Sequence, residues 1–340
     1  MQLTLVVPDL LDLPAATLAS LDARAPALSR LLRRGSPATT EVDGLLATAC
    51  RVCGIARQDD WPVAPRLARA AGIDPADAYW LCADPATLAV GADDVRLSAI
   101  VDDLPAEDAR ALIAALNAHF APDRIVFVAP SPARWFLRAS ESQRLRTRPP
   151  EAALGAPLFG LLPSGPDSAR WRRWQNEMQM LLFDHPVNRQ REREGAAPVN
   201  SVWLWGGGAA QPIAQADVSV LARESRIRDL ARGSAVDAAP PPPGFDAVPN
   251  RTAVAVWLDP IGTADAEHKL EAIDRAWMAP VERALDARRL SSPEIVAGGR
   301  DRALRFQPRR SSLVERWRAR LSPPCSLDVL AAAASEAAAR

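Results

Sequence analysis

Lysine and cysteine are scarce in this 340-residue chain, and each shortage excludes a class of chemistry. Lys269 is the one lysine, although lysine and arginine together number 41. A single residue is therefore left for a Schiff base or for the lysine of a phosphate-binding loop. The cysteines do not form a disulfide framework in a chain of this size, so we expect a reducing, cytoplasmic location. They are Cys50, Cys53, Cys82 and Cys325.

Net charge and long apolar runs are also absent. Acidic residues number 41, equal to the basic ones, so we expect no dedicated surface for nucleic acid or for an anionic membrane. No run of about eighteen apolar residues occurs, which predicts that no segment spans a membrane. The opening MQLTLVVPDLLDLP has no basic region and is interrupted by Asp9 and Asp12. It therefore predicts a first strand rather than a signal peptide.

The hydrophobic residues, 48% of the chain, follow strand-like and helix-like spacings in turn. Strands are expected near 3–7, 79–82, 86–90, 95–101, 124–129, 134–139, 201–205, 252–258, 294–297 and 302–306. Helices are expected near 15–34, 61–72, 105–120, 166–183, 187–195, 264–288 and 311–320. This order predicts an α/β fold in which a doubly wound sheet is interrupted by an inserted α+β module.

The same pattern predicts where the domains meet. We expect residues 1–75 and 185–325 to form the doubly wound domain and residues 76–184 to form the inserted module. Four consecutive prolines in AAPPPPGF indicate a Pro-rich linker or loop over 236–249. The Ala-rich residues 326–340 are expected to form a C-terminal helix or tail.

Three glycines follow a short aromatic strand in HPVNRQREREGAAPVNSVWLWGGG, residues 185–208. A phosphate-binding loop needs a lysine and a hydroxyl residue after its glycines, and GGGAAQPI has neither. The dinucleotide fingerprint needs a small residue at Gln211 and a following helix, which Pro212 disfavours. The favoured interpretation is that Gly206, Gly207 and Gly208 let the chain leave the end of a strand. The alternative is close approach of the backbone to an anion at the carboxyl edge of the sheet.

The spacing HPVN-x-x-R-x-x-x-G-x-x-P-x-N-x-x-W-L-W-G-x-G closely resembles a segment of the cofactor-independent phosphoglycerate mutases. The likeness is greatest to their archaeal-type branch, within the alkaline-phosphatase superfamily. WLDPIGTADAEHKLEAIDRAW (257–277) and ALSRLLRRG (27–35) are similar to other segments of that family. The resemblance implies an alkaline-phosphatase-like fold, and the chain looks like a member of a bacterial subfamily of regulators. It also implies ligand-binding positions at Asn188, Arg191, Asn200, Gly206 and Gly208.

The resemblance implies two divalent metals, Mn²⁺ or Zn²⁺, and a serine nucleophile. Asp9, Asp259 and Asp301 stand at positions that match metal-binding aspartates. Thr263 and Arg302 stand where the family pattern has histidines, and the whole chain has only three histidines. We therefore expect remnant metal positions without a metal cofactor, with Arg302 available to neutralise Asp301 or to bind an anion.

The segment that should carry the nucleophile, GLLATACRVCG (44–54), contains no serine. Thr48 and Cys50 are the candidate nucleophile positions. The pair formed by Cys50 and Cys53 lacks a second pair with metal-ligand spacing, so buried free thiols are favoured over a zinc site or a redox pair.

The three histidines receive separate interpretations. His185 precedes Pro186 at a helix boundary, which favours a capping or hinge role over metal ligation. His119 ends an amphipathic helix and is expected to be structural. His268 follows Asp259 in a helix, and only analogy with the family places it near a metal position.

ARWRRWQNEM (169–178) interleaves arginine and tryptophan, as some single-strand-binding proteins do. The spacing of Trp171 and Trp174 places both on one helix face, which favours a buried stripe bordered by arginines.

Three functions remain open. The first is a catalytically degenerate mutase-like protein that regulates or binds a phosphorylated or other anionic small molecule. The second is a residually active metal-dependent mutase or phosphatase, and the third is a scaffold that binds a protein partner through this helix.

Overall fold

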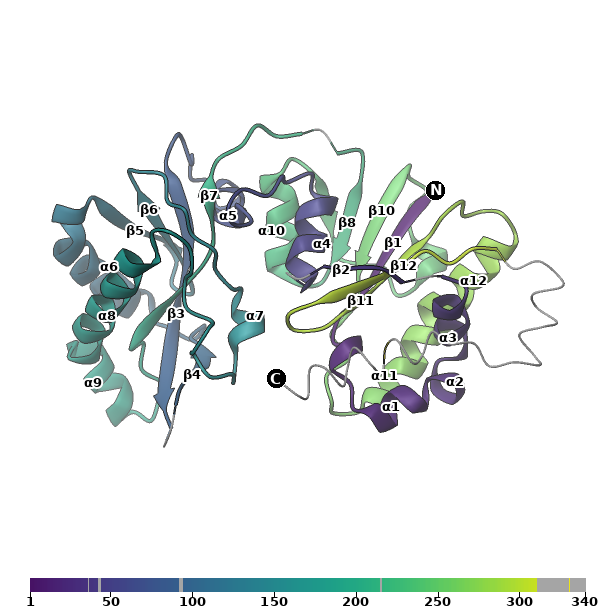
Figure 1. Ribbon diagram of the computed structural model, residues 1–340, viewed down its shortest axis with the longest axis horizontal. Helices are drawn as coiled ribbons and strands as arrows, with labels where there is room; N and C mark the ends of the chain where they lie inside the picture. The colour runs from purple at the N-terminus through teal and green to yellow at the C-terminus, as the bar shows by residue number, and fades with distance from the viewer. Residues whose placement is uncertain (36, 42–43, 92–93, 215, 311–329, 331–340) are drawn as a thin grey trace. The chain divides into compact units, whose positions relative to one another are not determined.

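The structure, a computed structural model, describes residues 1–340 except 36, 42–43, 92–93, 215, 311–329 and 331–340. The chain divides into two compact units (Figure 1). The outer unit comprises Met1–Cys53 and Gln215–Arg340, and the inserted unit comprises Gly54–Ala214. The inserted unit is thus one continuous stretch placed between the two segments of the outer unit.

A seven-stranded sheet forms the centre of the outer unit, in the order β2-β12-β11-β1-β10-β8-β9. Strands β11, β1, β10, β8 and β9 are parallel, whereas β12 and β2 are antiparallel additions at one edge. The central strand, β1, contains the apolar run LTLVV. Such a continuous apolar run is typical of a parallel strand that is covered on both faces. The strands are β1 (Gln2–Val7), β2 (Pro37–Glu41), β8 (Ser219–Ala222), β9 (Asp237–Ala239), β10 (Ala253–Trp257), β11 (Glu294–Gly298) and β12 (Ala303–Phe306).

Helices cover both faces of this sheet (Figure 1). Leu3, Leu5 and Val7 alternate along β1 and pack in one hydrophobic core with apolar side chains of α3 (Pro26–Arg33), α11 (Ala266–Ile273) and α12 (Ala279–Asp286). On the other face lie α4 (Gly44–Val52) and α10 (Ser225–Gly233). The predicted doubly wound α/β sheet with an inserted α+β module is confirmed.

Two long helices expected in the outer unit are each divided. The helix expected over 15–34 is α1 (Ala15–Ala19), α2 (Leu21–Arg24) and α3, and Pro26 begins the last of these. The helix expected over 264–288 contains a π-helical turn at Asp274–Met278, between α11 and α12. Pro280 has no N–H to offer Ala276, which explains why regular α-helical hydrogen bonding is interrupted there.

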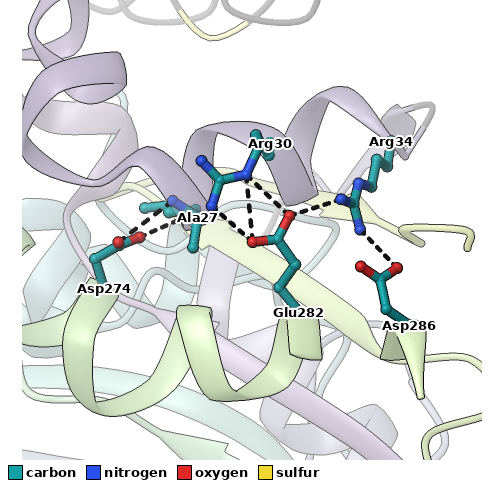
Figure 2. A network of polar contacts seen from close by, with 7 residues as sticks. Ala27, Arg30, Arg34, Asp274, Glu282 and Asp286 are labelled. Atoms are coloured by element: carbon teal, nitrogen blue, oxygen red, sulfur yellow. Dashed lines mark hydrogen bonds and ion pairs between the residues drawn. The ribbon is translucent and has the colours of Figure 1, made fainter. Parts of the chain in front are cut away.

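A polar network joins α3 to the helix that follows this π-helical turn (Figure 2). Arg30 and Arg34 converge on the carboxylate of Glu282, each with a nitrogen 2.7 Å from a carboxylate oxygen. Asp286 lies 3.3 Å from Arg34, while Asp274 accepts hydrogen bonds from the first turn of α3. Glu282 is buried, so its carboxylate is largely removed from water. The two arginines compensate its negative charge.

The inserted unit has its own five-stranded antiparallel sheet, in the order β4-β3-β6-β5 with β7 on the other side of β3. Its strands are β3 (Tyr79–Val90), β4 (Val95–Ile100), β5 (Ile125–Ser131), β6 (Arg134–Ala139) and β7 (Ser201–Ala209). Pro85 lies within β3 where pairing passes from β6 to β4, so its missing N–H breaks neither ladder. This is why the two strands expected at 79–82 and 86–90 form one.

Two helices pack on one face of this sheet, α6 (Ala106–Phe120) and α8 (Ser168–Phe183). Trp171 and Trp174 of α8 are buried in that core with their rings in edge-to-face contact at 5.0 Å. The predicted buried tryptophan stripe is therefore confirmed. The remaining helices of the unit are α5 (Val63–Ala70), α7 (Pro150–Ala153) and α9 (Pro186–Arg193).

The unit boundaries differ from the predicted ones. Residues 54–75 and 185–214 were expected in the doubly wound domain but belong to the inserted unit, because β7 pairs along β3 and α5 packs on both strands. The Pro-rich residues 236–249 lie within the outer unit, where Phe245 is buried in the core, and do not link two units. The tail expected at 326–340 and the helix expected at 311–320 fall outside the described residues, apart from Leu330. Among the described helices, none is long and apolar enough to cross a membrane.

Candidate functional site

Three parallel strands of the outer unit end side by side and deliver the predicted aspartates to one edge of its sheet. Asp9 follows β1, Asp259 follows β10, and the turn 299–302 follows β11. Ligands of open α/β sheets bind at the carboxyl ends of such strands. We call the loops after these three strands the candidate edge.

Asp9 connects two of these loops. Its backbone is left-handed, with φ 62°, and it begins the short 3-10 helix Leu10–Asp12. One carboxylate oxygen, Oδ2, accepts a hydrogen bond of 3.0 Å from the amide of Gly262 in the loop after β10. This hydrogen bond links the loop after β1 to the loop after β10 within the candidate edge.

Asp12 is a member of the candidate edge that sequence analysis did not single out. Burial raises the pKa of Asp12, and the neighbouring carboxylates of Asp9 and Asp301 raise it further, while Arg300 acts in the opposite direction. The turn passes close to Asp12, because a Cβ added to Gly299 would lie 3.0 Å from its Oδ1. The only signal in the sequence was the spacing of the two aspartates in PDLLD.

Asp259 pairs with a residue outside the three loops of the candidate edge. Its carboxylate is exposed and lies 3.1 Å from Nε of Arg223, the residue after β8. Among the described residues, which include all three predicted metal positions, no group of three or more His, Cys, Asp and Glu side chains could hold a metal ion. That Asp9, Asp259 and Asp301 are remnant metal positions stays a prediction: Asp9 and Asp301 both lie near Asp12, whereas Asp259 pairs with Arg223. The residues present therefore do not fit a two-metal centre.

Helix α4 begins against the turn of the candidate edge. A Cβ on Gly44 would lie 3.3 Å from the amide nitrogen of Arg302, and one on Gly298 would lie 2.7 Å from Leu45. The predicted nucleophile positions, Thr48 and Cys50, both have an exposed fraction of 0%. Their burial in the body of α4 offers no support for attack on a substrate, and the start of the helix presents Gly44 and Leu45 instead.

The two cysteines of this segment match the sequence interpretation. Cys50 and Cys53 are buried, and neither forms a disulfide. His268 is exposed on α11 and contributes to no metal-holding group among the described residues. Arg302 is half-buried, and its carbonyl accepts the amide of Gly299 at 2.9 Å to close the turn.

The residues of the HPVN segment lie in the inserted unit and bind the backbone of their own chain. Asn188 is buried, donates to the carbonyls of Leu182 and Val199 at 2.7 and 2.8 Å, and accepts the amide of Val199 at 2.8 Å. Asn200 pairs in the same way with the carbonyl and amide of Leu88. The contacts of both side chains are those of structural bridges.

Arg191 and His185 also serve the local fold. Arg191 is buried, donates to the carbonyl of Ala197 at 2.8 Å and pairs with Asp103 at 2.7 Å. His185 caps α9, because its Nδ1 accepts the amide of Val187 at 3.3 Å, and burial lowers its pKa. The predicted capping role of His185 is confirmed. The ligand role of Arg191 stays a prediction that its contacts do not support.

The three glycines do not end a strand, and that interpretation is wrong. Strand β7 continues to Ala209, and Gly206 and Gly207 both oppose Leu81 of β3 in a β-bulge, with Gly206 at φ 69°. A Cβ on Gly208 would lie 2.4 Å from Cβ of Pro62. The glycines therefore permit close packing of β7 against β3 and against the segment that precedes α5.

The amides of Gly206 and Gly207 already have acceptors within the inserted unit. Gly206 donates to the Thr147 hydroxyl at 2.9 Å, and Gly207 donates to Oδ2 of Asp60 at 3.4 Å. Asp60, 5% exposed, also accepts the amides of Trp61 and Thr147 and the Thr147 hydroxyl. Burial raises the pKa of Asp60 to about 6 in spite of these donors. The sequence left open that the backbone of these glycines approaches an external anion. In the structure, the carboxylate of Asp60 accepts the Gly207 amide instead.

Comparison with known proteins places this geometry in context. No family model matches the chain. A 2,3-bisphosphoglycerate-independent phosphoglycerate mutase of Methanosarcina mazei is 28% identical over 209 residues, which cover 55% of this chain and 49% of that protein. A probable enzyme of the same name from Geobacter sulfurreducens is 39% identical over 66 residues, 19% of this chain and 16% of that protein. The chain thus matches about half or less of the length of these curated relatives.

The PH0037 protein from Pyrococcus horikoshii has a similar structure, with a TM-score of 0.50 and 14% identity over 90% of this chain and 87% of that one. The chain is similar in sequence to the cofactor-independent phosphoglycerate mutases, as the motif predicted. Its alkaline-phosphatase-like α/β fold is likewise confirmed. The regulator-type subfamily stays a prediction.

Proposed function

We propose that this protein is a catalytically degenerate relative of the phosphoglycerate mutases that binds a phosphorylated or other anionic metabolite at the candidate edge. One observation carries the proposal: among the described residues, no three His, Cys, Asp or Glu side chains form a group that could hold a metal ion. Asp9 accepts the Gly262 amide, and Asp259 pairs with Arg223. A regulatory role would follow if binding of the metabolite changes what the protein contacts.

In this proposal, arginine side chains take the place of divalent metal ions in binding the anion. Arg223, Arg300 and Arg302 bring three guanidinium groups to the loops of the candidate edge, where a metallophosphatase needs divalent cations. A guanidinium binds phosphate oxygens through a planar fork of donors. It does not lower the pKa of a coordinated hydroxyl as a divalent metal does. This difference favours binding of a phosphorylated compound over transfer of its phosphoryl group.

A residual enzyme is the second candidate, and one observation favours it. Asp9 and Asp301 lie near enough to raise the pKa of Asp12, a repulsion that a bound cation such as Mn²⁺ would relieve. Turnover would also need a nucleophile, and the start of α4 offers none at Gly44 or Leu45.

A protein-binding scaffold is the third candidate, but its contact residues change. Trp171 and Trp174 are core residues and do not reach a partner. The exposed apolar side chains of the same helix are Met180 and Phe183, 74% and 71% exposed. A scaffold acting through α8 would use those two side chains.

The first two candidates separate in one pair of assays. We expect 3-phosphoglycerate to raise the melting temperature in metal-free buffer, and we expect Arg302→Ala to abolish that rise. Arg283→Ala, a change at an exposed position on α12, is the matched control and should keep it. Stoichiometric Mn²⁺ or Zn²⁺ together with mutase turnover in an enolase-coupled assay, both lost in Asp9→Ala, would overturn the proposal and establish the enzyme.

A further inference from the structure

A cavity of about 300 Å³ opens elsewhere at the sheet edge of the outer unit, but a second, polar cavity of about 250 Å³ in the inserted unit carries more chemistry. The polar cavity lies where the loop before β5, the end of β6 and the first half of α8 meet. Its wall includes three arginines, Arg124, Arg170 and Arg173. None of the residues considered for the candidate edge lies in this wall.

Arg170 is held in place before any ligand arrives. Its Nη2 donates to Oε1 of Gln143 at 2.6 Å, and its guanidinium stacks 5.1 Å from the ring centre of Trp174. Gln143 is only 4% exposed and is itself fixed, because it also accepts the indole N–H of Trp171 at 2.9 Å. A guanidinium fixed on two sides loses little conformational entropy when it binds a further group.

Trp174, whose ring supports Arg170 in the same wall, carries an unsatisfied donor. Its side chain is buried, and its indole Nε1 has no hydrogen-bond acceptor. Buried donors without an acceptor are uncommon, because each loses its hydrogen bond to water without replacement. The wall therefore combines a positioned cation with the aromatic ring that supports it, and the N–H of that ring is buried without an acceptor.

The charge of the cavity is positive. Asp123 and Glu141 are the two carboxylates in its wall, against three arginines. Glu141 compensates Arg170 weakly, since the separation is 3.9 Å and the Glu141 side chain is 70% exposed. Arg173 shares Glu177 with His119, at 3.4 and 3.2 Å respectively.

We propose that this cavity binds an oxyanion, the carboxylate or phosphate group of a small molecule, between Arg170, Arg173 and Arg124. The planar guanidinium of Arg170 fits the oxygens of either group in a bidentate manner. The site lies wholly within the inserted unit, so it is a second ligand site that does not depend on the function proposed for the candidate edge. Binding there would give the inserted unit its own response to anionic metabolites.

The test is a titration of the full chain with inorganic phosphate and, separately, with citrate, at constant ionic strength maintained with sodium chloride. Intrinsic tryptophan fluorescence and the melting temperature are followed. We expect saturable changes in both, and a larger response to one titrant identifies phosphate or carboxylate as the preferred group. Arg170→Ala and Arg173→Ala should each weaken apparent binding by about tenfold or more, the loss of one charge-assisted contact.

The controls distinguish this site from general charge effects and from the candidate edge. Arg172→Ala removes an exposed arginine of the same helix, bonded to Ser168 at 3.2 Å, and should leave binding unchanged. Arg302→Ala should keep the part of the response that Arg170→Ala removes, whereas loss of the whole response in Arg302→Ala alone would assign it to the candidate edge. Equal, non-saturating responses in all variants would overturn the proposal. Should Arg170→Ala not fold, Arg124→Ala and Trp174→Phe supply the same comparison.

Discussion

Asp274 caps a helix that begins far earlier in the chain, because its Oδ1 accepts the amide of Leu28 at 2.7 Å across a separation of 246 residues. Its Oδ2 accepts the amide of Ala27 at 3.3 Å (Figure 2). The residue at the N-cap of α3 is Ala25, which has no side-chain acceptor. Asp274 therefore satisfies amides at the start of α3 that local sequence leaves without a partner, and it places negative charge at the positive end of the helix dipole.

Removal of this cap should lower stability. We expect Asp274→Ala to reduce the free energy of unfolding by about 1–2 kcal/mol, the usual value for a lost helix cap. Urea denaturation monitored by circular dichroism measures it. Asp286→Ala removes a carboxylate that is ion-paired with Arg34 at the other end of the same network, and it should cost less. Equal losses in the two variants would contradict the capping role.

Asn188 offers a test of structure against ligand binding. Asn188→Ala would remove three buried hydrogen bonds and take the side-chain partner from the amide and carbonyl of Val199, while the Leu182 carbonyl keeps the amide of His185. The expected loss of unfolding free energy is about 3 kcal/mol. Gln190→Ala, at an exposed position of the same helix, should change stability by no more than about 0.5 kcal/mol. A stable Asn188→Ala protein with weakened ligand binding would restore the ligand role that the family resemblance implied.

The raised pKa of Asp60 predicts a particular pH dependence of stability. The folded value is about 6 and the reference value for the unfolded chain is 3.8, so between these values the folded chain keeps a proton that the unfolded chain has lost. The contribution of Asp60 to stability is complete below the unfolded pKa and falls as pH rises through the folded pKa. The total change is about 3 kcal/mol at most.

Comparison of unfolding free energies of the native protein and Asp60→Asn at pH 4.5 and pH 7.5 isolates this effect. The decrease over that interval should be smaller in the variant, which has no proton to exchange at position 60. The variant should also be less stable at both pH values, because an amide nitrogen replaces an oxygen that accepts from Thr147 and Gly207. An identical pH profile in both proteins would contradict the assignment.

Close packing at the end of β7 predicts that Gly208→Ala is costly. The added Cβ would lie 2.4 Å from Cβ of Pro62 and 3.0 Å from its Cα, so two backbone segments would have to separate. We expect a loss of about 2–3 kcal/mol in unfolding free energy. Gly195→Ala is the matched control, because its φ of 74° is strained for alanine but no atom lies within 4 Å. It should lose only about 1 kcal/mol.

Local signals predicted the layers of the fold but not the partners that these elements acquire. Alternation of LTLVV with helical spacings indicated a parallel sheet, and the histidine before Pro186 indicated a cap. The glycines of β7 look like turn residues when the segment is considered alone. They are needed because β7 forms a bulge opposite Leu81, a residue about 125 positions earlier in the chain. The same limit explains why that strand was assigned to the wrong domain.

The candidate site was predicted in its position and less well in its detail. The aspartates after β1 and β10 were identified because they match metal-binding aspartates of the family that the sequence resembles. The direction of each side chain depends on neighbours that only the fold supplies, as the pairing of Asp259 with Arg223 shows. Asp12 was missed because its environment comes from the turn after β11, almost 290 residues later.

The separation between β1 and its partners has a consequence for how the chain is made. Leu3 pairs with Val254, so at roughly 5–20 residues per second the ribosome needs on the order of 10–50 s to supply the neighbouring strand. During that interval the continuous inserted unit is synthesised completely, whereas the apolar β1 has neither of its parallel neighbours. We therefore expect nascent chains halted before β10 to contain a folded, protease-resistant inserted unit and an exposed β1 that binds chaperones.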